Sequence, residues 1–266
     1  MNHNINIPIR AARRAGAVII RYLEQRKDVK VDIKGKNDFV SEVDRQAEAE
    51  IIEVLRKAYP DDAIIAEESG NYEADSDYQW IIDPLDGTTN FLHGHPYFSV
   101  SIALKYKKRL EQAVIYDPLR DELYTGIRGK GALLNDRRMR VSGLSGLQGA
   151  LLGTGFPFKI PHHFECYMNT FKALHPQVSD IRRAGSAALD LAYVAAGRLD
   201  GFWEIGLQKW DFAAGVLLIQ EAGGLVSDFS GGQNYLKTGN IVAGSPKVFK
   251  GILQSIQPHL SESLKV

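Results

Sequence analysis

The chain has a single cysteine, Cys166, so it can form neither an internal disulfide bond nor a metal site built from several cysteines. A lone thiol is typical of a reducing compartment and predicts a cytoplasmic location. The sequence also lacks an excess of either charge, because 32 Lys and Arg residues balance 32 Asp and Glu residues. A neutral chain has no overall field that would attract nucleic acid or an anionic membrane.

Long apolar runs are missing as well. No segment reaches the roughly 18 apolar residues that a membrane helix needs, so we expect no membrane contact. Arginines interrupt residues 7–23, whose apolar side chains recur at steps of three and four. This period is typical of an amphipathic helix on a protein core and does not resemble a secretion signal.

Several catalytic motifs are absent. The sequence contains no HExxH and no cluster of His and Cys, which argues against a zinc site. It contains neither GxxxxGK[ST] nor GxGxxG, which disfavours a P-loop kinase and a dinucleotide-binding enzyme.

The 266 residues leave room for one large or two medium domains. Apolar runs of strand length alternate with helical periods, which predicts a mixed α/β fold of two sheets with helices packed between and around them. Small, turn-forming residues at 142–149 indicate a boundary between an N-terminal domain, 1–142, and a C-terminal domain, 143–266.

Four acidic residues stand where an apolar strand ends or a helix begins: Glu67, Asp83, Asp86 and Asp211. Two carboxylates about 4 Å apart repel each other by several kcal/mol, so a cluster of them requires neutralisation. Carboxylate and carbonyl oxygens suit Mg²⁺ better than zinc. We therefore expect a magnesium site.

The stretch WIIDPLDGTTNF, residues 80–91, fits such a site. Pro84 fixes the chain direction, which leaves the carbonyl of Leu85 free to point at a cation. Gly87 permits close backbone approach, and its N–H and that of Thr88 can face a phosphate. The alternative is an Asp-capped turn, with Asp86 as the N-cap and the threonines in solvent. This motif alone leaves both interpretations open.

Three motifs together resemble the inositol monophosphatases: EES at 67–69, WIIDPLDGTTNF at 80–91 and WDFAAG at 210–215. They occur in the family's order, and the resemblance covers essentially the whole chain. It implies a layered αβαβα sandwich, a lithium-sensitive phosphatase activity that depends on two to three Mg²⁺ ions, and a homodimer formed through the second half. The N-terminal domain would then carry most metal ligands.

The resemblance also implies the ligands. Glu67, Asp83 and the Leu85 carbonyl resemble those of the first Mg²⁺. Asp83, Asp86 and Asp211 resemble those of the second, and Glu67 would also touch a third, weaker ion.

Catalysis is implied to proceed by in-line attack of a metal-activated water held by Glu67 and Thr88, with no covalent phosphoenzyme. Asp44 matches the residue that supports Thr88, and it also fits a helix capping box with Ser41.

The implied substrate contacts lie mostly in the second half. Gly185, Ser186 and Ala187 open a helix and resemble the family's contacts to inositol hydroxyls, and Glu204 matches an acid that bonds the ring. Lys36 stands where the family has a lysine near the site, and Trp210 is interpreted as a core anchor that aims Asp211. The full predicted set is Asp86, Gly87, Thr88, Gly185, Ser186, Ala187, Glu204 and Asp211.

Two alternatives remain at this point. The shared motifs also fit a related phosphatase of sugar or nucleotide phosphates. The second half, RRAGSAALDLAYVAAGRLDGFWEIG, resembles the bacterial branch of the family that also acts in transcription antitermination with Nus proteins. A regulatory protein with vestigial catalysis could contact a Nus factor or RNA polymerase through basic residues at 105–109, 137–140 and 182–183. The plainer interpretation is that these are turn and rim charges.

Overall fold

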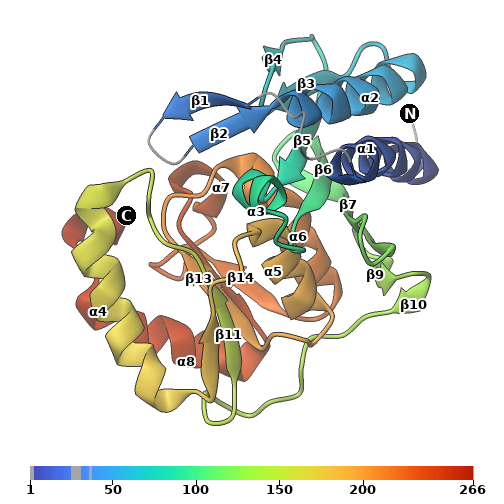
Figure 1. Cartoon of the computed structure of the whole chain (residues 1–266). Coiled ribbons are helices and arrows are strands. Elements are labelled where there is room, and N and C mark those ends of the chain that lie inside the picture. Colours follow the sequence, from blue (N-terminus) through green and yellow to red (C-terminus); the bar gives the residue numbers. More distant parts are fainter. Residues whose placement is uncertain (1–2, 25–30, 36–37, 266) are drawn as a thin grey trace.

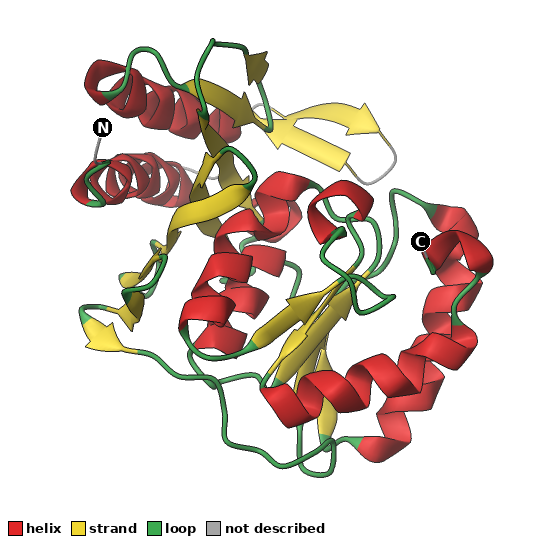
Figure 2. Ribbon diagram, turned by 180° about the vertical axis from the view of Figure 1, so that it is seen from behind, coloured by secondary structure: helices red, strands yellow, loops and turns green. Residues whose placement is uncertain are grey.

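Helices and sheets alternate in five layers, helix–sheet–helix–sheet–helix, as Figures 1 and 2 show. The computed structural model describes residues 3–24, 31–35 and 38–265. The layering confirms the predicted mixed α/β sandwich with two sheets.

The helical layers are formed by pairs of helices. The outer layer on the larger sheet contains α1 (Asn6–Glu24) and α2 (Glu42–Ala58). The middle layer contains α5 (Ala187–Ala195) and α6 (Lys209–Glu221). The other outer layer contains α4 (Phe164–Leu174) and α8 (Pro246–Ile256). Among helices of the described residues, none has the length and apolar character needed to cross a membrane.

The larger sheet has eight strands in the order β10-β9-β8-β7-β6-β5-β3-β4. Its neighbours are antiparallel except for β3 and β5, which run parallel. The strands are β3 (Ala63–Ala66), β4 (Gly70–Tyr72), β5 (Tyr78–Asp86), β6 (Ser99–Tyr106), β7 (Arg109–Asp117), β8 (Glu122–Ile127), β9 (Gly131–Leu134) and β10 (Arg137–Arg138). The β6–β9 part is an antiparallel meander, in which strands consecutive in sequence are neighbours in the sheet.

Strand β5 carries the central motif and is longer than its apolar run. The register with β6 shifts between Asp83 and Asp86, so a bulge accommodates Pro84, which has no N–H to donate. Gly87 then adopts φ 98°, and α3 (Thr88–His93) begins. The bulge and the glycine turn together place the Asp83 carboxylate, the Leu85 carbonyl and the Asp86 carboxylate at the end of one strand.

The smaller sheet has the order β12-β11-β13-β15-β14, so its last strand in sequence lies between two earlier ones. Strands β12, β11 and β13 are parallel, and β15 pairs antiparallel with β13 and β14. The strands are β11 (Leu151–Thr154), β12 (Asp180–Arg182), β13 (Gly201–Glu204), β14 (Leu225–Ser227) and β15 (Ile241–Gly244).

The remaining elements are short. They are a two-stranded antiparallel hairpin of β1 (Val31–Gly35) and β2 (Asp38–Ser41), the helix α7 (Tyr235–Thr238), and 3₁₀ turns at Pro161–His163, His175–Gln177, Gln257–His259 and Glu262–Leu264.

One hydrophobic core joins the two sheets through the middle helices. Residues 212–219 of α6 are all buried, and a Cβ on Gly215 would lie 2.4 Å from Leu191 Cβ on α5. The same core includes Ile81 of β5 and Phe202 of β13. The strands of the larger sheet end at 138 and those of the smaller sheet begin at 151. A boundary at 142/143 stays a prediction.

Candidate active site

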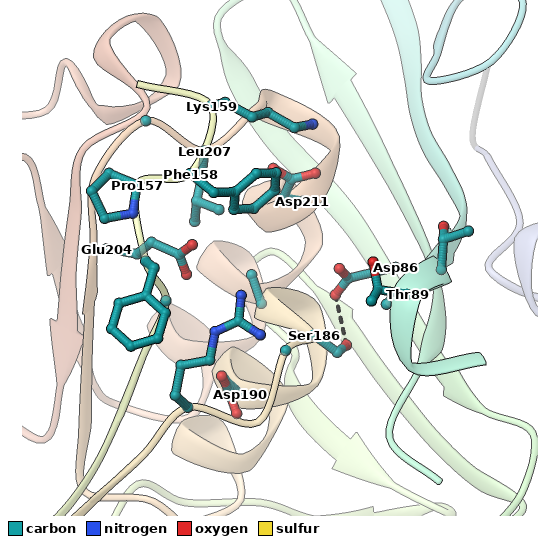
Figure 3. Close-up of a pocket in the computed structure, with 18 of the residues that line it drawn as sticks. Asp86, Thr89, Pro157, Phe158, Lys159, Ser186, Asp190, Glu204, Leu207 and Asp211 are labelled. Carbon is teal, nitrogen blue, oxygen red and sulfur yellow. Dashed lines mark hydrogen bonds between the residues drawn. The ribbon is translucent and has the colours of Figure 1, made fainter. Parts of the chain in front are cut away.

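A cavity of about 380 Å³ opens where β5, α3, α5 and α6 meet the segment 154–160. It is lined by eleven of the sequence-predicted residues: Glu67, Asp83, Leu85, Asp86, Gly87, Thr88, Gly185, Ser186, Ala187, Glu204 and Asp211. Asp44 reaches the cavity indirectly, through Thr88. Lys36 lies outside the described residues. Residues from both halves of the chain therefore surround one space, part of which is drawn in Figure 3.

Asp83 lies at the centre of the carboxylate cluster. It is 1% exposed, and one of its oxygens accepts the N–H of Leu85 at 3.0 Å. Burial raises the pKa of Asp83 well above its usual range, and the charges of Glu67, Asp86 and Asp211 raise that pKa further. A hydrogen bond to Glu67 acts in the same direction. The cluster therefore favours a cation or protons beside Asp83.

Asp86 connects the two halves of the chain. Its Oδ2 accepts the hydroxyl of Ser186 at 2.6 Å, drawn in Figure 3, and the N–H of Ala188 at 2.7 Å. Burial raises the pKa of Asp86 to about 7, although these two hydrogen bonds oppose the rise. Its carboxylate is therefore held at the start of α5 and does not cap α3.

The alternative of an Asp-capped turn is wrong in this structure. The N-cap of α3 is Gly87, with no side-chain hydrogen bond to the helix. Its positive φ admits glycine at little cost, and a Cβ there would lie 2.9 Å from the Tyr97 carbonyl. Close packing at residue 87 leaves Asp86 directed to the cavity.

Two acceptors lie within hydrogen-bond distance of the Thr88 hydroxyl. Its hydroxyl lies 2.8 Å from Asp44 Oδ1 and 3.1 Å from the Leu85 carbonyl, so it can donate to either acceptor. Asp44 is 1% exposed, which keeps its acceptor out of solvent. The Leu85 carbonyl, predicted to be free, already faces this hydroxyl and has its second lone pair left for another partner.

Asp211 comes to the cavity from the first turn of α6. Its Oδ2 accepts the N–H of Gln208 at 2.7 Å, and the two residues form a capping box. The preceding Trp210 packs against the core, and its carbonyl accepts the hydroxyl of Ser101. These contacts fix the start of α6 against the larger sheet.

Glu204 ends β13 on the opposite wall, where Figure 3 shows its carboxylate facing the cavity. Burial and the charges of Asp211 and Asp190 raise the pKa of Glu204 well above its usual range. A Cβ on Gly155 would lie 2.1 Å from Glu204 Oε1. The absence of a side chain at residue 155 therefore creates the space that this carboxylate occupies.

This contact gives a testable expectation. Alanine at Gly155 should push the Glu204 carboxylate out of place while the fold survives, because the clashing atoms belong to the end of a flexible side chain. For the inositol phosphate substrate that the motif resemblance implies, we expect KM to rise about tenfold, as for loss of a good hydrogen bond. Gly143→Ala is the matched control, because a Cβ there meets nothing within 4 Å. Equal kinetics for the two variants would contradict the expectation.

The donor set fits a hard cation. Six acidic side chains line the cavity. Burial and the charges of three of them, Glu67, Asp86 and Asp211, raise the pKa of Asp83, so a divalent ion beside these four would relieve their repulsion. In the described part of the chain, no three Asp, Glu, His or Cys side chains already stand arranged to hold a metal ion. The ligand set predicted from the sequence stays a prediction.

Sequence reasoning missed several residues of the cavity. Asn90 bonds the carbonyls of Tyr97 and Ala184, and Lys159 lines the opening. Arg183, interpreted as a rim charge, lines the cavity with its guanidinium over the Phe156 ring at 5.5 Å. The run GFPFK after a buried strand is the signal that could have indicated a rim with an aromatic and a basic side chain.

The fold and the cavity define a layered α/β protein with a carboxylate-lined site at the end of β5. Residues 2–261 match the inositol monophosphatase family, and the chain belongs to this family. It is 57% identical to the Nus factor SuhB of Pseudomonas aeruginosa and 56% identical to that of Escherichia coli K12, over 100% of each chain.

Solved structures agree with this assignment. The extragenic suppressor protein SuhB from Bartonella henselae superposes with a TM-score of 0.93 at 44% identity, covering 96% of this chain and 98% of that one. An inositol monophosphatase from Anabaena has a TM-score of 0.82 at 38% identity, covering 96% and 95%. The family and the fold predicted from the three motifs are confirmed.

Proposed function

We propose that the chain is a Mg²⁺-dependent phosphatase that hydrolyses inositol monophosphate to inositol and phosphate. The observation that carries the proposal is a single cavity lined by Glu67, Asp83, Asp86 and Asp211, by Glu204, and by Thr88, whose hydroxyl donates to the buried Asp44. An inositol monophosphatase from Staphylococcus aureus, 26% identical, has been solved with inositol monophosphate bound, which supports this substrate class.

Glu67, Asp83, Asp86, Asp211 and the Leu85 carbonyl would hold two to three Mg²⁺ ions. When bound, these ions neutralise phosphate charge, lower the pKa of water and stabilise the leaving alkoxide.

The chain's own groups orient the nucleophile. When the Thr88 hydroxyl donates to Asp44 Oδ1, its lone pairs are left to accept a hydrogen bond from water. Glu67, on the same cavity, would accept the second hydrogen of that water. The two acceptors together would aim the oxygen lone pair at phosphorus. Glu204 on the facing wall would hold the ring hydroxyls.

The test is phosphate release from inositol 1-phosphate, measured beside fructose 1,6-bisphosphate, a 3′-phosphonucleotide and histidinol phosphate, each with Mg²⁺, with EDTA and with Li⁺. We expect the highest kcat/KM for inositol 1-phosphate, loss of activity in EDTA and inhibition by Li⁺. A higher kcat/KM for a sugar or nucleotide phosphate would favour the related phosphatases instead.

We propose contact with the transcription machinery as a second function, because the full-length relatives at 53–57% identity are named Nus factors. Of the basic segments, Arg137 and Arg138 are exposed on β10, whereas Lys107 faces Asp77 and Arg182 faces Asp180. The segment 137–140 is therefore the first to test for binding to a Nus factor or RNA polymerase.

A homodimer formed through the second half is also proposed. Phe164 and Leu225 are exposed there and do not line the cavity. Light scattering after gel filtration measures the mass directly, and a mass near 29.5 kDa would contradict the dimer.

A further inference from the structure

One carboxyl group in the cavity has no part in the proposed reaction. Asp190 lies on α5, one turn beyond Ser186, and is 2% exposed. It lines the same cavity as the four carboxylates proposed to bind Mg²⁺, which are Glu67, Asp83, Asp86 and Asp211. Figure 3 shows it apart from Asp86 and Asp211, below Glu204 and Ser186 in that view. A buried carboxyl group at the wall of a cavity is costly unless it has hydrogen-bond partners.

Tyr97 supplies one partner. Its hydroxyl donates to Asp190 Oδ1 at 2.7 Å, across 93 positions of sequence. Tyr97 is itself fixed, because its carbonyl accepts the side-chain N–H of Asn90 and its ring meets that of Tyr193 edge-on at 5.8 Å. Among the described residues, no donor reaches the second oxygen of Asp190, Oδ2, which is not sealed from the cavity. The carboxyl group is thus held by one oxygen and open at the other.

Glu204 has a similar arrangement nearby. No hydrogen bond from the described residues reaches its carboxyl group, which occupies the space left by Gly155. Burial and the charges of Asp211 and Asp190 raise the pKa of Glu204, and Arg183 opposes the rise in the pKa of both Glu204 and Asp190, so these groups lie within electrostatic range. Two carboxyl groups open to one cavity, with a guanidinium beside them, form a polar surface next to the four carboxylates that are proposed to bind Mg²⁺.

The chemistry of this surface selects a ligand. Burial raises the pKa of Asp190 to about 8, so at neutral pH its open oxygen can carry a proton and donate as well as accept. Hydroxyl groups match such partners because they also donate and accept. An apolar leaving group would strand both carboxyl groups without hydrogen bonds, which a site of this kind rejects.

We propose that Asp190 contacts a second hydroxyl of a cyclic polyol phosphate beside the one held by Glu204, and that Tyr97 positions Asp190 for this contact. The inference rests on the proposed function for the identity of the ligand. It makes Asp190 a specificity-determining residue and Tyr97 a positioning residue that acts through it.

The test measures affinity by calorimetry for two probes, inositol 1-phosphate and inorganic phosphate, with Ca²⁺ present in place of Mg²⁺. Asp190→Ala should weaken inositol 1-phosphate binding about tenfold. The affinity for phosphate should fall less than twofold, because phosphate alone has no ring hydroxyls to contact Asp190 and Glu204. If the alanine variant does not fold, Asp190→Asn, which keeps an oxygen for Tyr97, carries the same comparison with an expected loss of about threefold.

Tyr97→Phe should give a smaller loss of inositol 1-phosphate affinity, about threefold, and in hydrolysis assays the loss should fall on KM. Combined with Asp190→Ala it should add nothing, because Tyr97 acts through that residue. Tyr124→Phe is the matched control: Tyr124 is a buried tyrosine that also donates to a carboxylate, Glu122, away from the cavity.

The outcomes separate the two proposals. Binding of inositol 1-phosphate without its hydrolysis in Mg²⁺ would remove the proposed function, while the Asp190 comparison would still decide the present inference. Equal losses for both probes, no loss for either, or additive effects of the two substitutions would overturn the role of Asp190 and Tyr97. Failure of the unaltered protein to bind inositol 1-phosphate would overturn it as well.

Discussion

Asp86→Asn is expected to reduce Mg²⁺-dependent phosphate release about a thousandfold, because one preorganised charged group beside a reacting phosphate has effects of this size. The asparagine oxygen can still accept from Ser186 and Ala188, so the start of α5 should keep its position. What is lost is one negative charge in a cluster that requires a cation. Initial rates at saturating Mg²⁺ measure the effect.

The matched control is Asp121→Asn, which also removes one aspartate charge, but at an exposed ion pair with Arg13. Its rate should stay within a factor of two. Full activity of Asp86→Asn would show that Asp86 is not a ligand of a catalytic metal ion. If the inactive variant also complements a deletion strain, the transcription role is the selected one; failure to complement would favour catalysis.

The second large effect concerns pH and stability. Burial raises the pKa of Asp190 to about 8, from about 4 in the unfolded chain, so the folded protein keeps this proton to higher pH. Stability from this group is complete below pH 4 and is lost as the pH rises through about 8. At pH 9 the ionised carboxylate should cost the metal-free protein roughly 3–5 kcal/mol relative to pH 4.

Asp190→Asn removes that titration while it keeps an acceptor for Tyr97. In EDTA, the variant should match the unaltered protein near pH 4 and exceed it by several kcal/mol at pH 9, as measured by urea unfolding. Glu122→Gln should instead be less stable to urea than the unaltered protein at pH 9, because hydrogen bonds from Arg198 and Tyr124 lower the pKa of Glu122 and so favour its ionised form in the folded state. The difference should disappear as the pH falls through that lowered pKa. Parallel pH profiles for the unaltered protein and Asp190→Asn would contradict the expectation.

The sequence predicts the parts of the site that a short segment determines. The four acids predicted to bind metal were recognisable because each stands where an apolar run ends or a helix begins, and Asp83, Pro84 and Asp86 lie in one strand and its bulge. Helix boundaries followed the apolar period, as in α1, which spans Asn6–Glu24 where the sequence predicts a helix over 7–23. The layered fold followed from the family resemblance, which patterns of strand and helix support.

The contacts that cross the chain could not be predicted in this way. Asp86 meets Ser186 over 100 positions, and Tyr97 meets Asp190 over 93, at distances that only the packing of α5 against the larger sheet determines. The apolar neighbours of Asp190 in α5 are typical of a buried helix, but nothing in the local sequence indicates Tyr97 as its partner. The Gly155–Glu204 contact is hidden for the same reason, since a glycine gives no sign of the side chain that fills its space.

The order of the smaller sheet has a consequence during protein synthesis. Strand β15 lies between β13 and β14, so β13 lacks one of its neighbours and β14 its sheet partner until residue 244 has left the ribosome. A nascent chain that stops earlier would present open strand edges and an acidic cluster whose opposite wall is not yet formed. Ribosome-attached chains should therefore be protease-sensitive in this half until residue 244 has emerged.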